Sequence, residues 1–71
     1  MERFLRYSLE HSRAIRMIWM EEGTLRQGKV YVEKLAEDCV QIYVLRPPRR
    51  LEIPIRDILS CDYTKDDEGI D

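Results

Sequence analysis

Three arginines surround a Pro-Pro pair in the stretch "VLRPPRRLEI", which covers residues 44 to 53. Arg46 precedes the two prolines, and Arg49 and Arg50 follow them. A guanidinium carries its N–H donors in a planar fork that matches the oxygens of a phosphate or a carboxylate. The cluster therefore predicts a rim that binds a small anionic ligand or single-stranded nucleic acid.

Residues elsewhere in the chain extend this predicted rim. Arg16 and Arg56 lie in segments that we expect to be strands near the cluster, and Tyr43 and Tyr31 face outward, where a base can stack on them. The candidate binding residues are Arg16, Tyr43, Arg46, Arg49, Arg50 and Arg56. A plainer interpretation stays open: charged tips and edges keep a β domain soluble and discourage edge pairing, and outward tyrosines pack across strands.

No set of residues in the chain is typical of an active site. His11 is the only histidine and has no cysteine or pair of acids near it, so we expect a surface residue rather than a metal ligand. The serines have no base beside them in a nucleophile motif, and the glycines are isolated, so there is no phosphate-binding loop. We therefore predict a protein that is not an enzyme and uses no metal and no cofactor.

The charge of the chain is divided unevenly along its length. Residues 1 to 56 hold 11 Lys and Arg against 8 Asp and Glu, whereas residues 57 to 71 hold one Lys against six acids. The body is thus mildly basic, with less basic excess than a dedicated duplex-DNA binder normally shows. We expect residues 64 to 71 to form an acidic, flexible tail that repels phosphate or covers the basic rim.

Cysteine usage and hydropathy predict a cytoplasmic protein. Cys39 and Cys61 each lie inside an apolar run, where a thiol acts as a small apolar side chain. Met1 is followed at once by charged residues, so we expect no secretory leader. The longest apolar run, residues 17 to 20, is far shorter than the roughly 20 residues of a membrane helix, so we expect no membrane partner.

The elements that must position the arginines follow from hydrophobic periodicity. Residues 2 to 12 have the spacing of a helix, and the period then changes to that of strands. The expected strands cover residues 14–20, 24–35, 39–45, 50–55 and 58–63. Val40, Ile42 and Val44 share one face of the third strand. In the fifth strand, Leu59, Cys61 and Tyr63 share a face.

One helix followed by five short strands predicts a mainly β (α+β) fold over residues 1 to 63. We expect the strands to curl into a five-stranded antiparallel barrel of the SH3-like or Sm-like kind, because a flat sheet of this length leaves an apolar face too large for one helix to cover. Gly28 and Pro54 lie where such a barrel must bend, and Pro54 also favours an edge strand. The alternative is an open sheet with the helix lying across it.

Trp19 and Met20 suggest a second class of function. One of these neighbours must point away from the interior if the first strand alternates, and an exposed large side chain there could form part of a subunit interface. The alternative to ligand binding is therefore a structural or protein–protein interaction module that self-associates or docks on a partner through a strand edge.

The order of these elements resembles a known family. The stretch "HSRAIRMIWMEEGTLRQGKVYVEKL" resembles the opening of a WYL domain, the Sm-like barrel of many bacterial transcription regulators. The stretch "RRLEIPIRDILSCDY" is similar to the closing segment of that family, with Ile53, Ile55 and Ile58 at its apolar positions. Small stand-alone bacterial proteins of this barrel type, whose roles are unassigned, are similar to it as well. The resemblance implies a barrel and, by analogy of fold, a regulatory role.

The chain differs from the family pattern at three places. The Trp-Tyr-Leu signature is absent near Val40 to Ile42. In the closing segment, Leu51 aligns with the leading arginine, one place beyond Arg50, and Asp57 aligns with the second arginine. What the resemblance implies therefore concerns the fold more than the ligand site.

Overall fold

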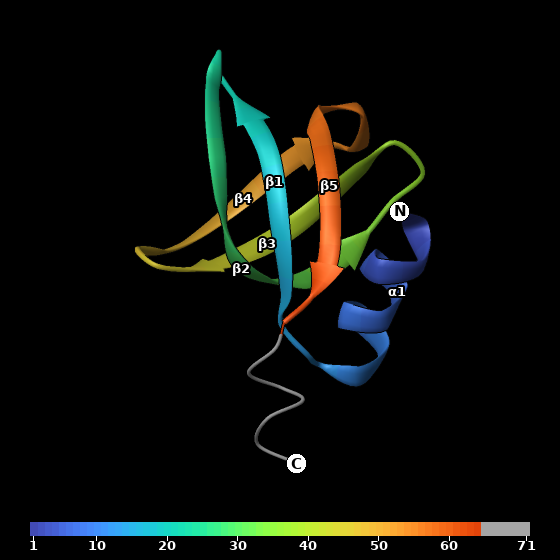
Figure 1. Cartoon of the computed structure of the whole chain (residues 1–71). Helices are drawn as coiled ribbons and strands as arrows, with labels where there is room; N and C mark the ends of the chain where they lie inside the picture. Colours follow the sequence, from blue (N-terminus) through green and yellow to red (C-terminus); the bar gives the residue numbers. More distant parts are fainter. Residues whose placement is uncertain (65–71) are drawn as a thin grey trace.

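The structure, a computed structural model, describes residues 1 to 64, which form one α-helix and five strands (Figure 1). The elements in chain order are α1 Glu2–His11, β1 Ile15–Glu21, β2 Thr24–Leu35, β3 Cys39–Leu45, β4 Pro48–Pro54, the short 3-10 turn η1 Ile55–Asp57, and β5 Ile58–Tyr63. The prediction of a mainly β chain with one N-terminal helix is confirmed for these residues. Apart from Thr64, which is buried, the predicted acidic tail lies outside the described residues.

The strand bounds follow from alternation and from where the turns fall. β2, β3 and β5 cover the predicted ranges, whereas β4 begins two residues earlier than predicted, at Pro48. Pro48 pairs with Leu45, so the β3–β4 turn holds only Arg46 and Pro47. A proline is tolerated at the first residue of a strand, and on an edge strand, because no ladder bond there needs its missing N–H. β4 is an edge strand, as Pro54 predicted.

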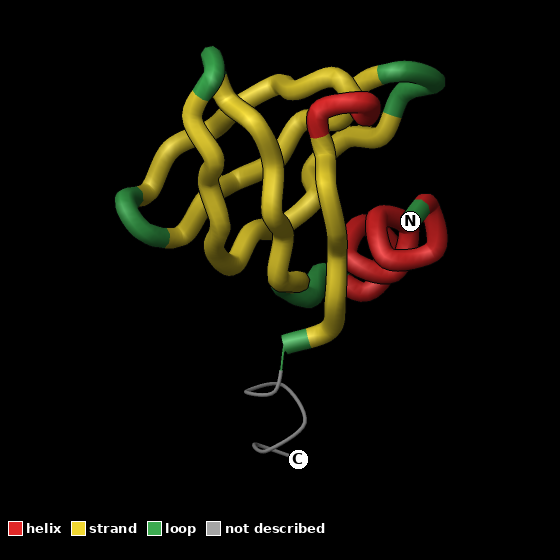
Figure 2. Tube along the Cα trace, turned by 45° about the horizontal axis from the view of Figure 1, so that its top comes forward, coloured by secondary structure: helices red, strands yellow, loops and turns green. Residues whose placement is uncertain are grey.

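The five strands form one antiparallel sheet in the order β4-β3-β2-β1-β5. The sheet is strongly curled, and Figure 1 shows β1 and β5 crossing in front of β3 and β4. The long strand β2 belongs to both layers, because it pairs with β1 along its first half and with β3 along its second half. No ladder joins the edge strands β4 and β5 among the described residues, so the sheet is open and the predicted closed barrel is not confirmed. The tube view in Figure 2 shows the same curl from another direction.

The core lies on the inner face of this curl. Alternate residues of each strand are buried there, and Val40, Ile42 and Val44 of β3 face inward as predicted. The main buried side chains of the other elements are Leu5, Ile15, Met17, Trp19, Val30, Val32, Ile53 and Ile58. Because Trp19 is buried, its neighbour Met20 points outward. In β5 the prediction was wrong for Leu59, which is exposed, because the β1–β5 register shifts between Ile18 and Trp19.

Helix α1 covers one open side of the sheet. Leu5 enters the core, and Phe4 and Tyr7 pack against the ring of Tyr63, each with ring centroids 4.8 Å apart. The buried hydroxyl of Ser8 donates to the carbonyl oxygen of Arg13 at 2.6 Å and accepts from the N–H of Val32 at 2.9 Å. This side chain therefore joins the helix to β2. Among residues 1 to 64, no helix has the length and apolar character that a membrane span requires.

Candidate functional site

Arg49 lies on the inner side of β4 rather than on an open rim. It pairs across the ladder with the buried Val44, and its guanidinium reaches Glu21 at the end of β1. Nη1 donates to Oε2 at 3.0 Å and Nη2 donates to Oε1 at 2.9 Å, so the contact is bidentate. The indole N–H of Trp19 donates to the same Oε1 at 3.3 Å. Since β1 and β4 are not neighbours in the sheet, this ion pair bridges the interior of the curl at one end.

The contact between Arg49 and Glu21 favours the charged form of both side chains. Hydrogen bonds from Arg49 lower the pKa of Glu21, against a smaller opposing effect of burial, and the hydrogen bond from Trp19 lowers it further. The same hydrogen bond raises the pKa of Arg49. The two terminal nitrogens of the guanidinium are thus already occupied by a carboxylate. An external anion at Arg49 would have to compete with Glu21.

Arg50 lies on the opposite, outer side of β4. Its Nε donates to Glu33 at 2.8 Å, and this hydrogen bond raises the pKa of Arg50. Its guanidinium carbon lies 5.2 Å from the centroid of the Tyr43 ring, within the range of a cation–π contact. Tyr43 in turn pairs with Tyr31 across β2 and β3. The structure therefore brings Arg50 and Tyr43 together in one row across three strands, with the Arg50 side chain 63% exposed.

Arg16 and Arg46 come together at a groove next to this row. The groove has a volume of about 480 Å³ and is lined by Arg16 of β1, by Gln27, Gly28 and Lys29 of β2, and by Leu45 and Arg46 at the end of β3. Lys29 of β2 pairs with Arg16 of β1, and the next residue of β2, Val30, pairs with Val44 of β3. β2 therefore lies between the strand that carries Arg16 and the strand that ends just before Arg46. Within residues 1 to 64, neither Arg16 nor Arg46 forms an ion pair.

Arg56 lies apart from the other predicted site residues. The expectation that Arg56 lies on a strand near the cluster was wrong, because Arg56 belongs to η1, which follows Pro54. Pro54 pairs with Cys39 at the end of the β3–β4 ladder away from the Arg46 turn. A strand of this length extends about 20 Å. The predicted set is thus divided into an outer group of Arg16, Tyr43, Arg46 and Arg50, an internal Arg49, and a distant Arg56.

Sequence reasoning missed the two carboxylates that hold these arginines, Glu21 and Glu33. They lie 28 and 17 residues from Arg49 and Arg50, so no local pattern links them. One signal was available for the first pair: alternation puts Glu21 on the same inner face as Trp19. An inward-facing glutamate needs a cation, and Arg49 is the arginine that alternation places on the inner face of β4.

The structure gives partners for the Cys39 thiol and for the ring of His11. A hydrogen bond from the Cys39 thiol to Glu52, at 3.1 Å, raises the pKa of Cys39, and burial raises the pKa of Cys61 to about 11. Neither is a ready nucleophile, because the thiolate is the reactive form. The ring of His11 lies beside the ring of Tyr7, with centroids 5.3 Å apart and the two planes tilted by 44°. In the described part of the chain, no group of three or more His, Cys, Asp or Glu side chains could hold a metal ion.

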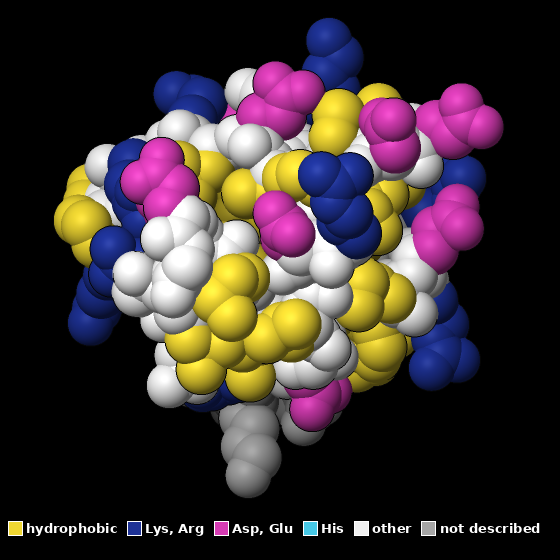
Figure 3. All heavy atoms as spheres, turned by 90° about the horizontal axis from the view of Figure 1, so that it is seen from above, with side chains coloured by type: hydrophobic (Ala, Val, Ile, Leu, Met, Phe, Trp, Pro, Cys, Tyr) yellow, Lys and Arg dark blue, Asp and Glu magenta, His cyan; other side chains and the backbone are white. Residues whose placement is uncertain are grey.

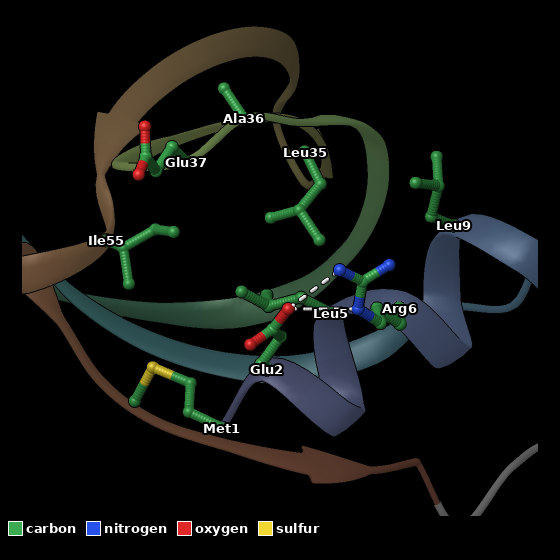
Figure 4. A pocket seen from close by; sticks show the side chains of 9 residues that line it. All are labelled: Met1, Glu2, Leu5, Arg6, Leu9, Leu35, Ala36, Glu37 and Ile55. Carbon is green, nitrogen blue, oxygen red and sulfur yellow. Dashed lines mark hydrogen bonds and ion pairs between the residues drawn. The ribbon is translucent and has the colours of Figure 1, made fainter.

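A second hollow of about 550 Å³ lies between α1 and the segment after β2 (Figure 4). Leu5, Leu35 and Ile55 form its apolar wall. Its polar side chains include Glu2 and Arg6, which are joined at 2.8 Å and so satisfy each other. This hollow offers apolar contact but no convergent set of polar groups.

Comparisons of the chain with protein-family models, with curated proteins and with solved structures found no match.

Proposed function

We propose that the chain is a non-enzymatic binding module that contacts single-stranded nucleic acid through the outer basic face, defined as Arg16, Tyr31, Tyr43, Arg46 and Arg50. A small anionic ligand such as a free nucleotide shares the same phosphate chemistry. One observation carries the proposal: Arg16 and Arg46, without ion pairs among the described residues, line one groove beside the partly exposed stack of Arg50 on Tyr43.

The two kinds of group on this face suit the two parts of a nucleotide. Arginines without a carboxylate partner can neutralise phosphates, and adjacent tyrosines can accept stacked bases regardless of sequence. Tyr31 and Tyr43 are directly opposite one another, which puts their rings on neighbouring strands of the same face. Arg49 has no part in this proposal because Glu21 occupies it, and Arg56 has none because it lies at the far end of the hairpin.

The small number of cations sets the expected strength of binding. If Arg16, Arg46 and Arg50 neutralise about three phosphates, the logarithm of the association constant for a single strand should fall as the logarithm of the salt concentration rises, with a slope of about −2. We expect weak, salt-sensitive binding, which agrees with the mildly basic body of the chain. Duplex DNA should bind no better than a single strand, because stacking on Tyr43 requires an unpaired base.

The test is a titration of a fluorescently labelled oligothymidylate, followed by anisotropy at several salt concentrations. The double variant Arg16→Ala/Arg46→Ala should lose about tenfold or more in affinity, because each phosphate contact contributes. Arg56→Ala is the matched control and should bind like the wild type. Equal binding by the double variant and the control would remove the proposal. Parallel titrations with free nucleotides and inorganic phosphate distinguish a strand from a small anion.

The finer structural and cellular assignments belong to the same proposal. The curl of the sheet and the helix beside it support a relationship to SH3-like and Sm-like barrels, including the barrel of WYL domains. The free thiols of Cys39 and Cys61 support a location in a reducing compartment such as the cytoplasm.

A further inference from the structure

The groove between Arg16 and Arg46 is a local concentration of positive charge. Three of its lining residues are the cations Arg16, Lys29 and Arg46, and none of its described lining residues is acidic. Arg16 and Arg46 form no ion pair within residues 1 to 64. Asp62, the cross-strand neighbour of Arg16, instead accepts a hydrogen bond from the N–H of Tyr63 at 2.8 Å. The groove therefore has the charge that attracts an acidic segment.

Charge is distributed differently at the end of the molecule that holds the β1–β2 turn. Figure 3 views the chain from this end and shows Lys and Arg side chains interspersed with Asp and Glu side chains. For example, Oε1 of Glu21 lies 2.9 Å from Nη2 of Arg49 and 3.7 Å from Nε of Arg26. An acidic segment would meet carboxylates as well as cations there. Of these two surfaces, the groove is the one that suits it.

An acidic segment follows the described part of the chain. Residues 65 to 71, with the sequence KDDEGID, hold one lysine against four acids. The acids are Asp66, Asp67, Glu68 and Asp71. The groove and this segment thus carry opposite charge, and whether they can meet depends on where the segment begins.

The sheet places the start of this segment beside the groove. Tyr63 pairs with Ile15, and Asp62 pairs with Arg16. Figure 1 shows the end of β5 next to the start of β1. The segment therefore begins three residues after the cross-strand neighbour of Arg16.

The segment is also long enough to cross the groove. One row of ladder pairs runs from the end of β5 to β3 in three strand-to-strand steps, through Ile15, Val30 and Val44. At about 4.8 Å for each step, the row covers roughly 14 Å. Arg46 lies two residues beyond Val44. Seven extended residues span at most about 25 Å, so the carboxylates near the start of the segment can reach Arg16 and its far end can reach Arg46.

We propose that residues 65 to 71 bind the groove in the free protein, where their carboxylates pair with Arg16 and Arg46, and that a bound nucleic-acid strand displaces them. The inference rests on the proposed function, because it assigns the regulation of the same site. Carboxylates and phosphates compete for the same guanidinium donors. The segment is therefore an autoinhibitory competitor built into the chain.

The strength of this inhibition follows from the kind of contact. Exposed ion pairs are weak individually, but a short connection holds the segment at a high effective concentration beside the groove. We expect the covered form to be about four times as populated as the open form at low salt. Since only the open form binds a strand, the apparent affinity is lowered about fivefold.

The test compares two variants of the full chain that lose the same amount of negative charge. The tail variant neutralises three acids of the segment and is Asp66→Asn/Asp67→Asn/Glu68→Gln. The control variant neutralises three exposed glutamates that do not line the groove and is Glu10→Gln/Glu22→Gln/Glu37→Gln. Far-UV circular dichroism confirms that each variant is folded.

The first measurement is NMR of the arginine Nε–H resonances at low salt, in the absence of nucleic acid. The resonances of Arg16 and Arg46 should move in the tail variant relative to the wild type and stay in place in the control variant. The resonance of Arg56, at the far end of the hairpin, should stay in place in both. Resonances of Arg16 and Arg46 that are the same in the wild type and the tail variant overturn the proposal.

The second measurement is the titration of labelled oligothymidylate at low salt. The tail variant should bind about fivefold more tightly than the wild type, and the control variant should gain less than about twofold. The gain should shrink as the salt concentration rises, because salt screens exposed charges. Equal gains in the two variants would show general repulsion of phosphate in place of a contact, and would overturn the proposal.

The two measurements separate this proposal from the binding function on which it rests. If the resonances of Arg16 and Arg46 move but no variant binds the oligonucleotide, the binding function fails and the contact of residues 65 to 71 with the groove stands. If every variant binds the oligonucleotide equally and the resonances do not move, the contact fails and the binding function stands.

Discussion

Arg49 follows the Pro-Pro pair, where the sequence predicts an exposed rim, but it forms an ion pair with Glu21 inside the curled sheet. The β3–β4 ladder puts Arg49 opposite the buried Val44, and from there its guanidinium reaches the far side of the curled sheet. The carboxylate of Glu21 accepts two hydrogen bonds from it and one from Trp19. A bidentate pair fixes the orientation of both side chains, so it positions β1 relative to β4 without any strand pairing between them.

Replacing Glu21 by Gln should destabilise the protein by about 1 kcal/mol near neutral pH, at the upper end for partly exposed pairs because the contact is bidentate. The pKa of Glu21 is lowered on folding, so its contribution is complete above the usual glutamate value of about 4.3. It is lost as the pH falls through the lowered value.

Urea unfolding of the wild type and of Glu21→Gln, from pH 7 down to pH 3, measures this difference. The two free energies of unfolding should converge at the acidic end. The neighbouring Glu22→Gln is the control, since Glu22 is exposed and has no ion pair among residues 1 to 64. A difference between wild type and Glu21→Gln that grows toward low pH would contradict the assignment.

At the scale of the element, Ser8 holds the helix on the sheet. Its hydroxyl is the partner of a β2 N–H and of the carbonyl oxygen of Arg13, just beyond the helix. Val32 lies where the β2–β3 register shifts, between Val32 and Lys34. A short helix is marginal by itself, so α1 depends on this joint and on Leu5.

Ser8→Ala should lower the free energy of unfolding by about 2 kcal/mol, because a buried N–H and a carbonyl oxygen both lose their partner. The amide proton of Val32 should also exchange faster with solvent than in the wild type, relative to amides of β3. Ser60→Ala, an exposed serine in β5, should change stability by less than about 0.5 kcal/mol. Equal effects of the two substitutions would show that Ser8 is not a joint.

The elements themselves were largely predictable. β2, β3 and β5 have the predicted bounds because each is a run of strand-forming residues, and Gly23 and Asp38 mark the turns before β2 and β3. β4 starts early because Pro48 can open a strand, a tolerance that periodicity does not reveal. The exposure of Leu59 was not predictable, since strict alternation in β5 assumes a register without the shift opposite Trp19.

At the scale of the whole molecule, the division of the arginines could not be read from the sequence. Whether Arg49 faces inward depends on where the turn of Arg46 and Pro47 begins, because a shift of one residue exchanges the faces of Arg49 and Arg50. The meeting of Arg16 with Arg46 depends in turn on β2 lying between their strands. The closure of the sheet is likewise a global property, because β4 and β5, although they follow one another in the chain, lie at opposite edges of the sheet and meet only if the whole sheet curls far enough.

The small core should make the whole fold sensitive to one cavity. A domain of this size is stable by roughly 4 to 10 kcal/mol, and Ile42 is completely buried at the centre of β3. Ile42→Val should cost about 1 kcal/mol and Ile42→Ala about 3 kcal/mol. Thermal unfolding followed by circular dichroism should therefore show a graded fall in the midpoint, with one cooperative transition in each case. A midpoint unchanged by Ile42→Ala would mean that β3 is not at the centre of the core.

Trp19 is the only tryptophan in the chain, and its indole is buried while its N–H bonds to the carboxylate that Arg49 holds. The molecule consequently carries its own optical reporter at a point where an ion pair joins two non-adjacent strands, β1 and β4. Its emission should be blue-shifted while the bridge is intact and should move to the red when the two strands separate. The opening of the curled sheet can thus be followed without any attached dye.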